Sequence, residues 1–290
     1  MRYCWISAFG LLVAPSAAGA QGVDNWSGVY AGADVGGVSA RVRAVSTVNV
    51  QQVTNIFITG RGIVVVPGTS TSFDRRSTST NVLYGGTVGF LAQSGNWVFG
   101  LEGDGHGSRS SGSLTSTASI PGTILSPAST VISTRDYRTR YDWSLRARTG
   151  IALGHTLLYV AGGVTGTKVR VRSVDTYTLP AGTSPGGVAA PALGPIVTTA
   201  SQARTMTGWT AGIGAERRIA SHASIGLDAR YDNYGSKDFA GSPTTTSPPL
   251  LNYGNNGAAG TPLNPSPVAS STTRISLTDL RLSLRLLFRF

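Results

Sequence analysis

The last fifteen residues, SLTDLRLSLRLLFRF (276–290), decide the fold class of this chain. At a period of two residues, one face carries only leucine and phenylalanine from Leu280 to Phe290, while the other face carries the charges up to Arg285. A helical period would scatter the arginines around the cylinder, so the segment is predicted to be a β-strand. In a soluble sandwich the leucines would pack in a core and the charges would face water, so this strand alone leaves the environment of the leucine face open.

The first twenty residues predict export. One early positive charge, a short apolar run and the small residues 18–20 form the pattern of a secretory signal peptide cleaved before Gln21. The apolar run is short for a retained membrane helix. We therefore expect residues 1–20 to be a signal peptide and residues 21–290 to be one domain. Cleavage also removes Cys4, the only cysteine, and with it any disulfide or thiolate metal site.

The charge balance narrows the partners. The chain has 24 Lys+Arg and 13 Asp+Glu, and removing Arg2 leaves 23 bases against 13 acids, a net charge of +10. Only 13% of residues are charged, and no basic run is interleaved with aromatic residues, so we expect no nucleic-acid partner. Phosphate-bearing lipid is the better candidate for an exported basic protein. The composition predicts no cofactor and no metal.

Eight strand-like segments alternate with two kinds of connection. The segments are residues 26–42, 81–93, 97–106, 139–153, 156–172, 204–219, 223–235 and 276–290. Three connections are short turns, and four are long stretches rich in Ser, Thr, Gly and Pro, at about residues 43–80, 107–138, 173–203 and 236–273. This alternation is typical of bacterial transmembrane barrels, which have short periplasmic turns and long outer loops. We predict an all-β fold, an eight-stranded antiparallel transmembrane β-barrel with four long extracellular loops and three short periplasmic turns.

In such a barrel the leucine face meets lipid, and the charged face meets an enclosed lumen. Slipping the last strand by one residue would turn its arginines into hydrocarbon, at about 2 to 4 kcal/mol each near the midplane. The same phase in the other strands predicts a lumen network of seven acids and six bases. Its members are Glu102, Asp104, Arg140, Asp142, Arg146, Arg148, Glu216, Asp228, Arg230, Asp232, Asp279, Arg281 and Arg285. Eight strands leave an interior that side chains fill, so we expect the lumen to be plugged.

Basic side chains also gather near the outer ends of the strands. They are Arg41, Arg43, Arg75, Arg76, Arg109, Arg135, Arg138, Lys168, Arg170, Arg172 and Arg204. Guanidinium groups bind phosphate bidentately, so we expect Lys168, Arg170, Arg172 and Arg204 to form a rim that contacts lipopolysaccharide. A rim that is only solvated is the alternative.

Five blocks of sequence carry a family resemblance. They are WSGVYAGADVGG (26–37), GNWVFGLEGD (95–104), TLLYVAGGV (156–164), GWTAGIGAERRI (208–219) and LRLLFRF (284–290). These blocks resemble the strands of the small porin-like surface barrels of alphaproteobacteria, related in architecture to the OmpA and OmpX barrels. The resemblance implies an outer-membrane protein that stabilises the envelope and displays surface loops, with Phe290 as its signal to the barrel assembly machinery. Some members resemble haem binders or adhesins, but the loops diverge here.

Enzymatic chemistry has one weak candidate. His155 and His222 fall in predicted periplasmic turns, which leaves His106, with Asp104 and Ser108, as the only local match to an acyl-modifying site. Because His106 faces inward, we predict a protein without catalysis. A lipid-modifying enzyme stays an alternative, as does acid–base chemistry by paired lumen carboxylates.

Binding and transport leave further alternatives. A narrow porin or a small-ligand barrel is one, and a haem site would have to use loop tyrosines such as Tyr137, Tyr177 and Tyr253. A soluble secreted sandwich is the architectural alternative. Residues 55–68, NIFITGRGIVVVPG, are predicted to form a hairpin that packs on neighbouring loops or presents an exposed edge to a surface partner.

Overall fold

The described part of the protein consists of β-strands and the turns and short segments between them. The computed structural model describes residues 25–50, 53–57, 62–66, 69–108, 110–122, 128–179, 182–183, 189–190, 193–240, 244–246, 251–253, 259–262 and 268–290. Its strands are β1 (Gly28–Val50), β2 (Val53–Phe57), β3 (Gly62–Val66), β4 (Thr69–Ser94), β5 (Trp97–Ser108), β6 (Ser111–Ile120), β7 (Ser129–Leu153), β8 (Thr156–Leu179), β9 (Gly182–Thr183), β10 (Ala189–Ala190), β11 (Leu193–Arg218), β12 (Ala223–Phe239), β13 (Thr244–Thr246), β14 (Leu251–Tyr253), β15 (Ala259–Pro262) and β16 (Val268–Arg289). No helix in these ranges is long and apolar enough to cross a membrane. The predicted signal peptide lies outside the described residues.

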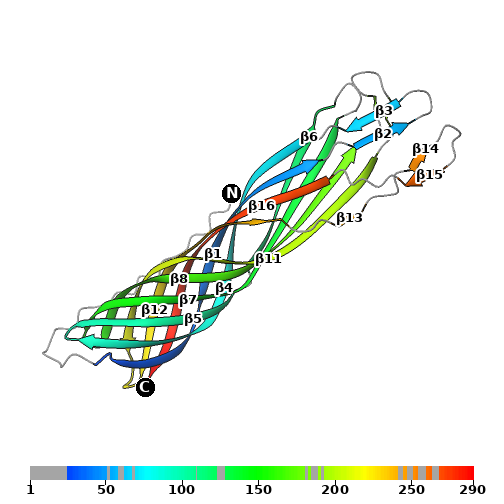
Figure 1. Ribbon diagram of the computed structural model, residues 1–290. Helices are drawn as coiled ribbons and strands as arrows, with labels where there is room; N and C mark the ends of the chain where they lie inside the picture. The colour runs from blue at the N-terminus through cyan, green and yellow to red at the C-terminus, as the bar shows by residue number, and fades with distance from the viewer. Residues whose placement is uncertain are drawn as a thin grey trace.

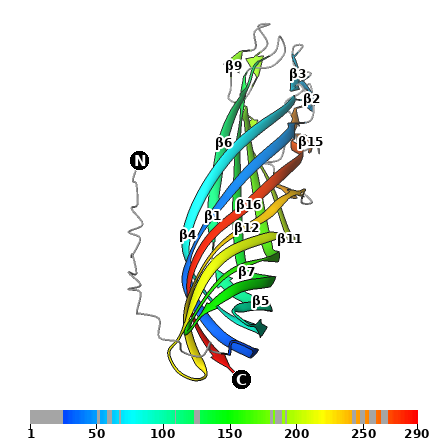
Figure 2. The ribbon, with the colours of Figure 1, turned by 90° about the vertical axis from the view of Figure 1, so that its left-hand side faces the viewer.

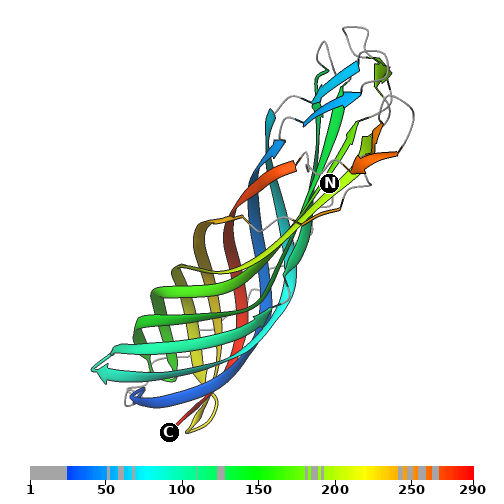
Figure 3. The ribbon, with the colours of Figure 1, turned by 45° about the vertical axis from the view of Figure 1, so that its right-hand side comes forward.

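Eight of the strands close into a ring, as predicted. Their antiparallel order is β12, β16, β1, β4, β5, β7, β8 and β11, and β11 pairs with β12 to complete the circle. The result is an elongated tube whose strands wind around its axis (Figures 1 and 3). In Figure 2 the neighbouring strands β4, β1, β16 and β12 follow one another around one side of it.

One end of the tube carries the three short turns. Two-residue turns join β4 to β5 and β7 to β8, and each needs a left-handed backbone, which Gly95 (φ 58°) and Gly154 (φ 57°) provide. Residues 219–222 join β11 to β12. The C-terminus lies at this same end, called the turn end below (Figure 1).

The half of the tube near the turn end is apolar on its outside. In β16 the side chains of Leu280, Leu282, Leu284, Leu286 and Phe288 are 42–58% exposed. Aromatic side chains bound this apolar zone on both sides. Those on the far side are Tyr84, Tyr141, Trp143, Trp209 and Tyr231, and those near the turns are Phe90, Trp97, Phe99 and Phe288. An apolar band between two aromatic belts is the surface that a bilayer requires.

The strands run well past this band. Six of them are 22 to 26 residues long, whereas about 9 to 11 residues cross a bilayer. Much of each stretch predicted to be a long loop is therefore strand. The polar composition of these stretches was misleading because the polar and apolar faces of each strand change places beyond the band. In β16, for example, Leu277 and Ile275 point inward there, while Arg274 is exposed on the outside. Ser and Thr on the outer face there meet water, and Thr also suits a strand.

Beyond the band the ring separates into two sheets. The β4–β5 ladder ends at Leu83 and Ser108, and β6, which follows β5, is paired only with β7 among the described residues. The β11–β12 ladder ends at Trp209 and Asn233. One sheet is therefore formed by β12, β16, β1 and β4, and the other by β6, β7, β8 and β11, to which the short β13 is added.

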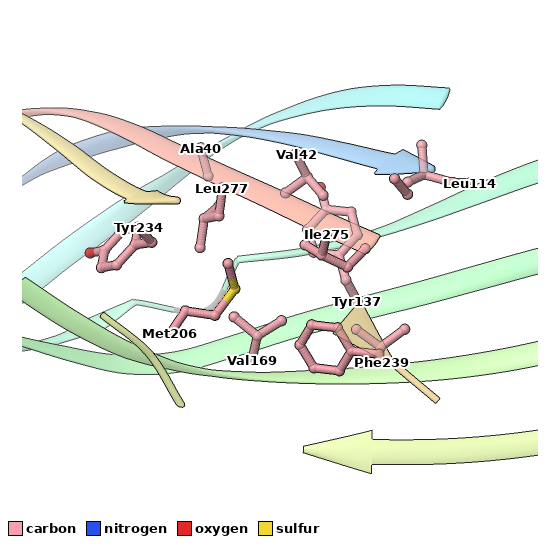
Figure 4. Close-up of a cluster of buried hydrophobic side chains, with 12 residues drawn as sticks. Ala40, Val42, Leu114, Tyr137, Val169, Met206, Tyr234, Phe239, Ile275 and Leu277 are labelled. Carbon is pink, nitrogen blue, oxygen red and sulfur yellow. The ribbon is translucent and has the colours of Figure 1, made fainter. Parts of the chain in front are cut away.

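An apolar core lies between these two sheets (Figure 4). Its members are Ala40, Val42, Ala44, Leu114, Tyr137, Val169, Val171, Met206, Tyr234, Phe239, Ile275 and Leu277. The far half is thus a β-sandwich with an ordinary hydrophobic core, continuous with a ring whose polarity is inverted. A sandwich, the architectural alternative, describes only this half.

The predicted hairpin at residues 55–68 is confirmed in its backbone pairing. Strands β2 and β3 pair antiparallel from Val53 opposite Val66 to Phe57 opposite Gly62. The hairpin lies at the end of the molecule opposite the C-terminus (Figure 1). Residues 58–61 lie outside the described residues.

Candidate functional site

The lumen of the ring holds a dense network of buried charges, and its hub is Glu102. This residue is fully buried on β5, and its Oε2 accepts hydrogen bonds from Arg285 Nη2 (2.8 Å) and Arg148 Nη1 (2.9 Å). Its Oε1 accepts from Arg146 Nη2 at 2.5 Å, and the hydroxyl of Tyr30 donates to Oε2 at 2.7 Å. One carboxylate therefore joins guanidinium groups from β7 and β16, which lie on opposite sides of the ring.

A second group of charges continues the network toward the far end. Arg230 Nη1 donates to both carboxylate oxygens of Asp104 at 3.0 Å. Arg281 donates to Asp142, and its Nε lies 2.7 Å from Asp232 Oδ2.

The remaining acids each meet an arginine as well. Glu216 Oε1 lies 2.5 Å from Arg148, Asp228 Oδ1 lies 3.1 Å from Arg146 and Asp279 Oδ2 lies 3.1 Å from Arg281. Twelve of the thirteen predicted network residues are buried here.

Arg140 is the exception, and its predicted inward orientation is wrong. The β7–β8 register shifts between Thr139 and Asp142, so Arg140 and Tyr141 both point outward and are exposed. A β-bulge adds one residue to one strand and reverses the phase on one side of it. Counting in twos along a sequence cannot detect this shift.

The network includes residues that the sequence analysis missed. Asp34 Oδ2 lies 2.8 Å from His106 Nε2, and the hydroxyl of Tyr159 donates to Asp228 Oδ2 at 2.8 Å. A signal was available for Tyr30 and Asp34, because they share one phase of β1 and alternate with the exposed Val29 and Val35.

Two glycines make room for the lumen tyrosines. A Cβ atom on Gly89 would lie 2.4 Å from the ring of Tyr30, and one on Gly214 would lie 2.2 Å from the ring of Tyr159. Both distances are shorter than any van der Waals contact. The aromatic rings can therefore lie flat on the wall, where the guanidinium carbon of Arg148 is 3.7 Å from the ring centre of Tyr159.

Apolar layers close the network at both ends. Toward the far end lies the sandwich core. At the turn end a second cluster forms a floor, made of Trp26, Tyr30, Leu91, Val98, Ala152, Leu157, Tyr159, Ala161 and Leu287. The ring of Trp26 is covered by the guanidinium groups of Arg218 and Arg289, at 4.9 and 4.8 Å. The charges are thus enclosed between two apolar layers.

Several residues expected on the surface are inside the sandwich. Arg135, predicted in the basic rim, is 3% exposed and donates to Asp175 Oδ1 at 2.8 Å. Tyr137 and Tyr177 are buried too, so neither side chain is free at the surface for haem. Tyr253 has no described side chain. The sequence analysis placed these residues outside because it extended the pattern of the ring, in which the outward side chains are apolar. In the sandwich the inward side chains are the apolar ones.

The four residues predicted to form the lipopolysaccharide rim divide into two places. Lys168, Arg170 and Arg172 are exposed on the outer face of β8, beyond the aromatic belt. Arg204 is exposed, but it falls in the phase of the buried Met206 and lies near Asp238. A hydrogen bond from Arg274 lowers the pKa of Asp238, and the charge of Arg204 contributes less.

The chemistry available to His106 is restricted by burial. Its side chain is 3% exposed, and Asp34, Asp104 and Asp142 all lie within 3.4 Å of its ring nitrogens. The side chain of Ser108 lies outside the described part of the structure. No group of three or more His, Cys, Asp or Glu residues in the described ranges is arranged to hold a metal ion.

Several solved structures of outer-membrane proteins are similar to this chain at low sequence identity. Ail, the attachment invasion locus protein of Yersinia pestis, is 13% identical, with 89% of this chain and 99% of that chain covered and a TM-score of 0.28. The outer membrane protease OmpT of Escherichia coli is 12% identical, with 93% and 98% covered and a TM-score of 0.37. The outer membrane protein OprG of Pseudomonas aeruginosa is 10% identical, with 88% and 97% covered and a TM-score of 0.35. No curated protein matches the chain.

A family model settles the class. The model of the outer membrane protein beta-barrel domain matches residues 7–257, which is most of the chain. The ring of eight strands, the apolar band and the two aromatic belts are the features that this class requires. The chain therefore belongs to the outer membrane protein beta-barrel domain family, and its place is the bacterial outer membrane.

Proposed function

We propose that this protein is a closed, non-enzymatic barrel that stabilises the outer membrane and carries a rigid β-sandwich beyond it for surface display. The observation that carries the proposal is the lumen network centred on Glu102, enclosed between two apolar layers. Within its family we place the chain among the small porin-like surface barrels of alphaproteobacteria, on the strand blocks described above.

The packing argues against a solute channel. Glu102 is bonded to arginines from both sides of the ring, so its contacts cross the space that a solute would use. Displacing them would leave charges buried without partners, at about 3 to 5 kcal/mol for each broken pair. A path would also have to pass the apolar floor at Trp26 and the sandwich core. A narrow porin is therefore the weaker candidate.

The same packing argues against catalysis. A general base must reach a substrate, but the ring nitrogens of His106 already face carboxylates, and its side chain is 3% exposed. The carboxylates of Glu102 and Asp104 are likewise occupied by arginines. These contacts favour a structural role for the residues that a lipid-modifying enzyme would need.

The partners in this proposal are those of an inserted barrel. Outer-membrane lipid covers the apolar band, and lipopolysaccharide phosphates meet the basic residues beyond the aromatic belt. The barrel assembly machinery recognises the terminal Phe290, whose side chain is 81% exposed. The β2–β3 hairpin lies at the outer end, where it can meet a surface partner.

Conductance in planar bilayers tests the proposal. We expect purified full-length protein to insert, shown by a mobility shift between unboiled and boiled samples on SDS gels, and to give no large stepwise conductance. The variant Glu102→Ala/Arg285→Ala removes two side chains that meet in the lumen but leaves the apolar floor and the sandwich core in place, so it should give no large stepwise conductance either. Large steps from the unmodified protein would refute the closed-lumen function.

A further inference from the structure

Four cations share one patch on the outer face of β7 and β8. They are Arg138 and Arg140 on β7 and Lys168 and Arg170 on β8, and all four are exposed. Arg138 and Arg170 are direct partners in the β7–β8 ladder. Like charges directly opposite each other on one face of a sheet are destabilising. The arrangement therefore favours the binding of an anion.

The β-bulge is what completes this cation patch. Without the register shift between Thr139 and Asp142, Arg140 would point into the lumen with the other network residues. With it, Arg140 lies beside Lys168, and Arg138, Arg140, Tyr141, Lys168, Arg170 and Ala203 line a hollow of about 150 Å³. Bulges commonly re-aim a side chain in this way.

The chain itself provides little counter-charge to the patch. Among the described residues none forms an ion pair or a hydrogen bond with the four cationic side chains. On the other sheet, by contrast, Arg43 pairs with Asp74 at 2.6 Å and Arg274 with Asp238 at 2.7 Å. In the described part of the chain, the acid beside the patch is Asp136, which lies opposite Arg172 in the ladder and lines an adjoining hollow of about 490 Å³ together with Arg138, Arg170 and Arg172. One carboxylate can balance only one of these cations, so at least three of the four cations in the patch remain in excess.

The position of the patch relative to the membrane indicates which anion it binds. Tyr141 lines the hollow and belongs to the far aromatic belt, and Trp143 follows it on the same face. Aromatic belts lie at the level of lipid headgroups, so the cations just beyond Tyr141 are at the level of the headgroup phosphates. Guanidinium pairs bind phosphate bidentately, and Lys adds a point charge.

We propose that Arg138, Arg140, Lys168 and Arg170 form a built binding site for a phosphorylated lipid headgroup of the outer leaflet. The inference deepens the lipopolysaccharide contact in the proposed function and rests on it for the leaflet. It also changes the expected rim: Arg204 is not part of the site, and Arg138 and Arg140 are.

Lipid binding by the full-length protein in detergent tests the site. The probe is bisphosphorylated lipid A, measured as bound lipid per protein by native mass spectrometry. The test variant is Arg138→Gln/Arg170→Gln. The control is Arg41→Gln/Arg76→Gln, which removes two exposed cations from β1 and β4 on the other sheet. A charge-assisted hydrogen bond is worth about a factor of ten or more, so we expect the test variant to bind lipid A at least tenfold more weakly and the control to match the unmodified protein.

A stability measurement separates a binding role from a structural one. In phosphate-free detergent, Arg138→Gln should raise the urea midpoint, because it relieves the repulsion between Arg138 and Arg170. With lipid A present, the unmodified protein should gain more stability than this variant. Equal lipid A binding by the test variant and the control, or no gain from lipid A, would overturn the inference.

Two further measurements separate a lipid headgroup from free phosphate as the ligand, and separate a failure of this site from a failure of the proposed function. If inorganic phosphate at an equal phosphate concentration stabilises the protein as much as lipid A, the assignment to a lipid headgroup is overturned. Conductance of the unmodified protein is measured in parallel. A closed barrel that fails to bind lipid A refutes only the site, whereas large conductance with intact lipid A binding refutes only the closed-lumen function.

Discussion

Neutralising the hub of the lumen should destabilise the protein more than almost any other isosteric change. Glu102→Gln keeps the size of the side chain but removes the charge that accepts hydrogen bonds from Arg146, Arg148 and Arg285. All three guanidinium groups are at most 3% exposed, so bulk solvent cannot readily replace that partner. Removing one partner from a buried ion pair costs about 3 to 5 kcal/mol, and we expect a loss of that size here.

Urea unfolding in detergent or lipid vesicles measures this loss, with tryptophan fluorescence and the SDS-gel mobility shift as independent readouts. The control is Asp74→Asn, which removes the acid of the exposed pair with Arg43 and should leave the midpoint almost unchanged. If Glu102→Gln unfolds at the same urea concentration as the control, the network does not hold the barrel closed, and our account of the lumen is wrong.

Three further predictions test other parts of the structure. Leu284→Arg, near the middle of the apolar band, should cost about 2 to 4 kcal/mol in lipid vesicles, whereas Thr272→Arg, exposed beyond the band, should cost little. Phe239→Ala should lower the free energy of unfolding by about 3 to 5 kcal/mol, because it leaves a cavity in the sandwich core. Limited proteolysis of intact cells should then cut the far half of the variant while the ring in the membrane stays protected. If the variant resists proteolysis as well as the unmodified protein does, the sandwich does not have a packed core. A hydrogen bond from Arg43 holds the pKa of Asp74 below its ordinary value of 3.8. The stability that this pair contributes should therefore be present above pH 3.8 and be lost as the pH falls through the pKa of the folded state. An NMR titration that places the pKa of Asp74 at or above 3.8 would contradict the pairing.

Sequence periodicity was sufficient to identify the ring. The alternation of leucine and arginine from Leu280 to Arg285 predicts both the strand and its lipid-facing side, because a slip of one residue would expose charges to hydrocarbon. The same phase correctly places Glu102 and Arg230 in the lumen. These features are visible in the sequence because each strand in the membrane has one face toward the polar lumen and one toward lipid. The polarity of a side chain therefore indicates which face it lies on.

The sandwich was not visible in the same way. Beyond the band the outer face of each strand meets water and the inner face meets an apolar core. The alternation of polar and apolar residues is therefore reversed there, although β16 continues through Ile275 and Leu277. The outer face there is Ser, Thr and Arg, and its composition resembles that of a loop. A rule that equates polar segments with loops therefore ends the strands too early.

By itself, then, the sequence determined a ring of eight strands, the face of each strand that meets lipid and the charged character of the lumen, because the bilayer imposes the same period on every strand. Only the tertiary structure decided which charges meet. It paired Asp34 with His106, buried Arg135 against Asp175 and turned Arg140 out of the lumen at a bulge. It also placed Arg138 opposite Arg170, on strands whose register is set by pairing across the sheet. Contacts between strands depend on register and on bulges, and one strand's sequence does not contain its neighbour's position.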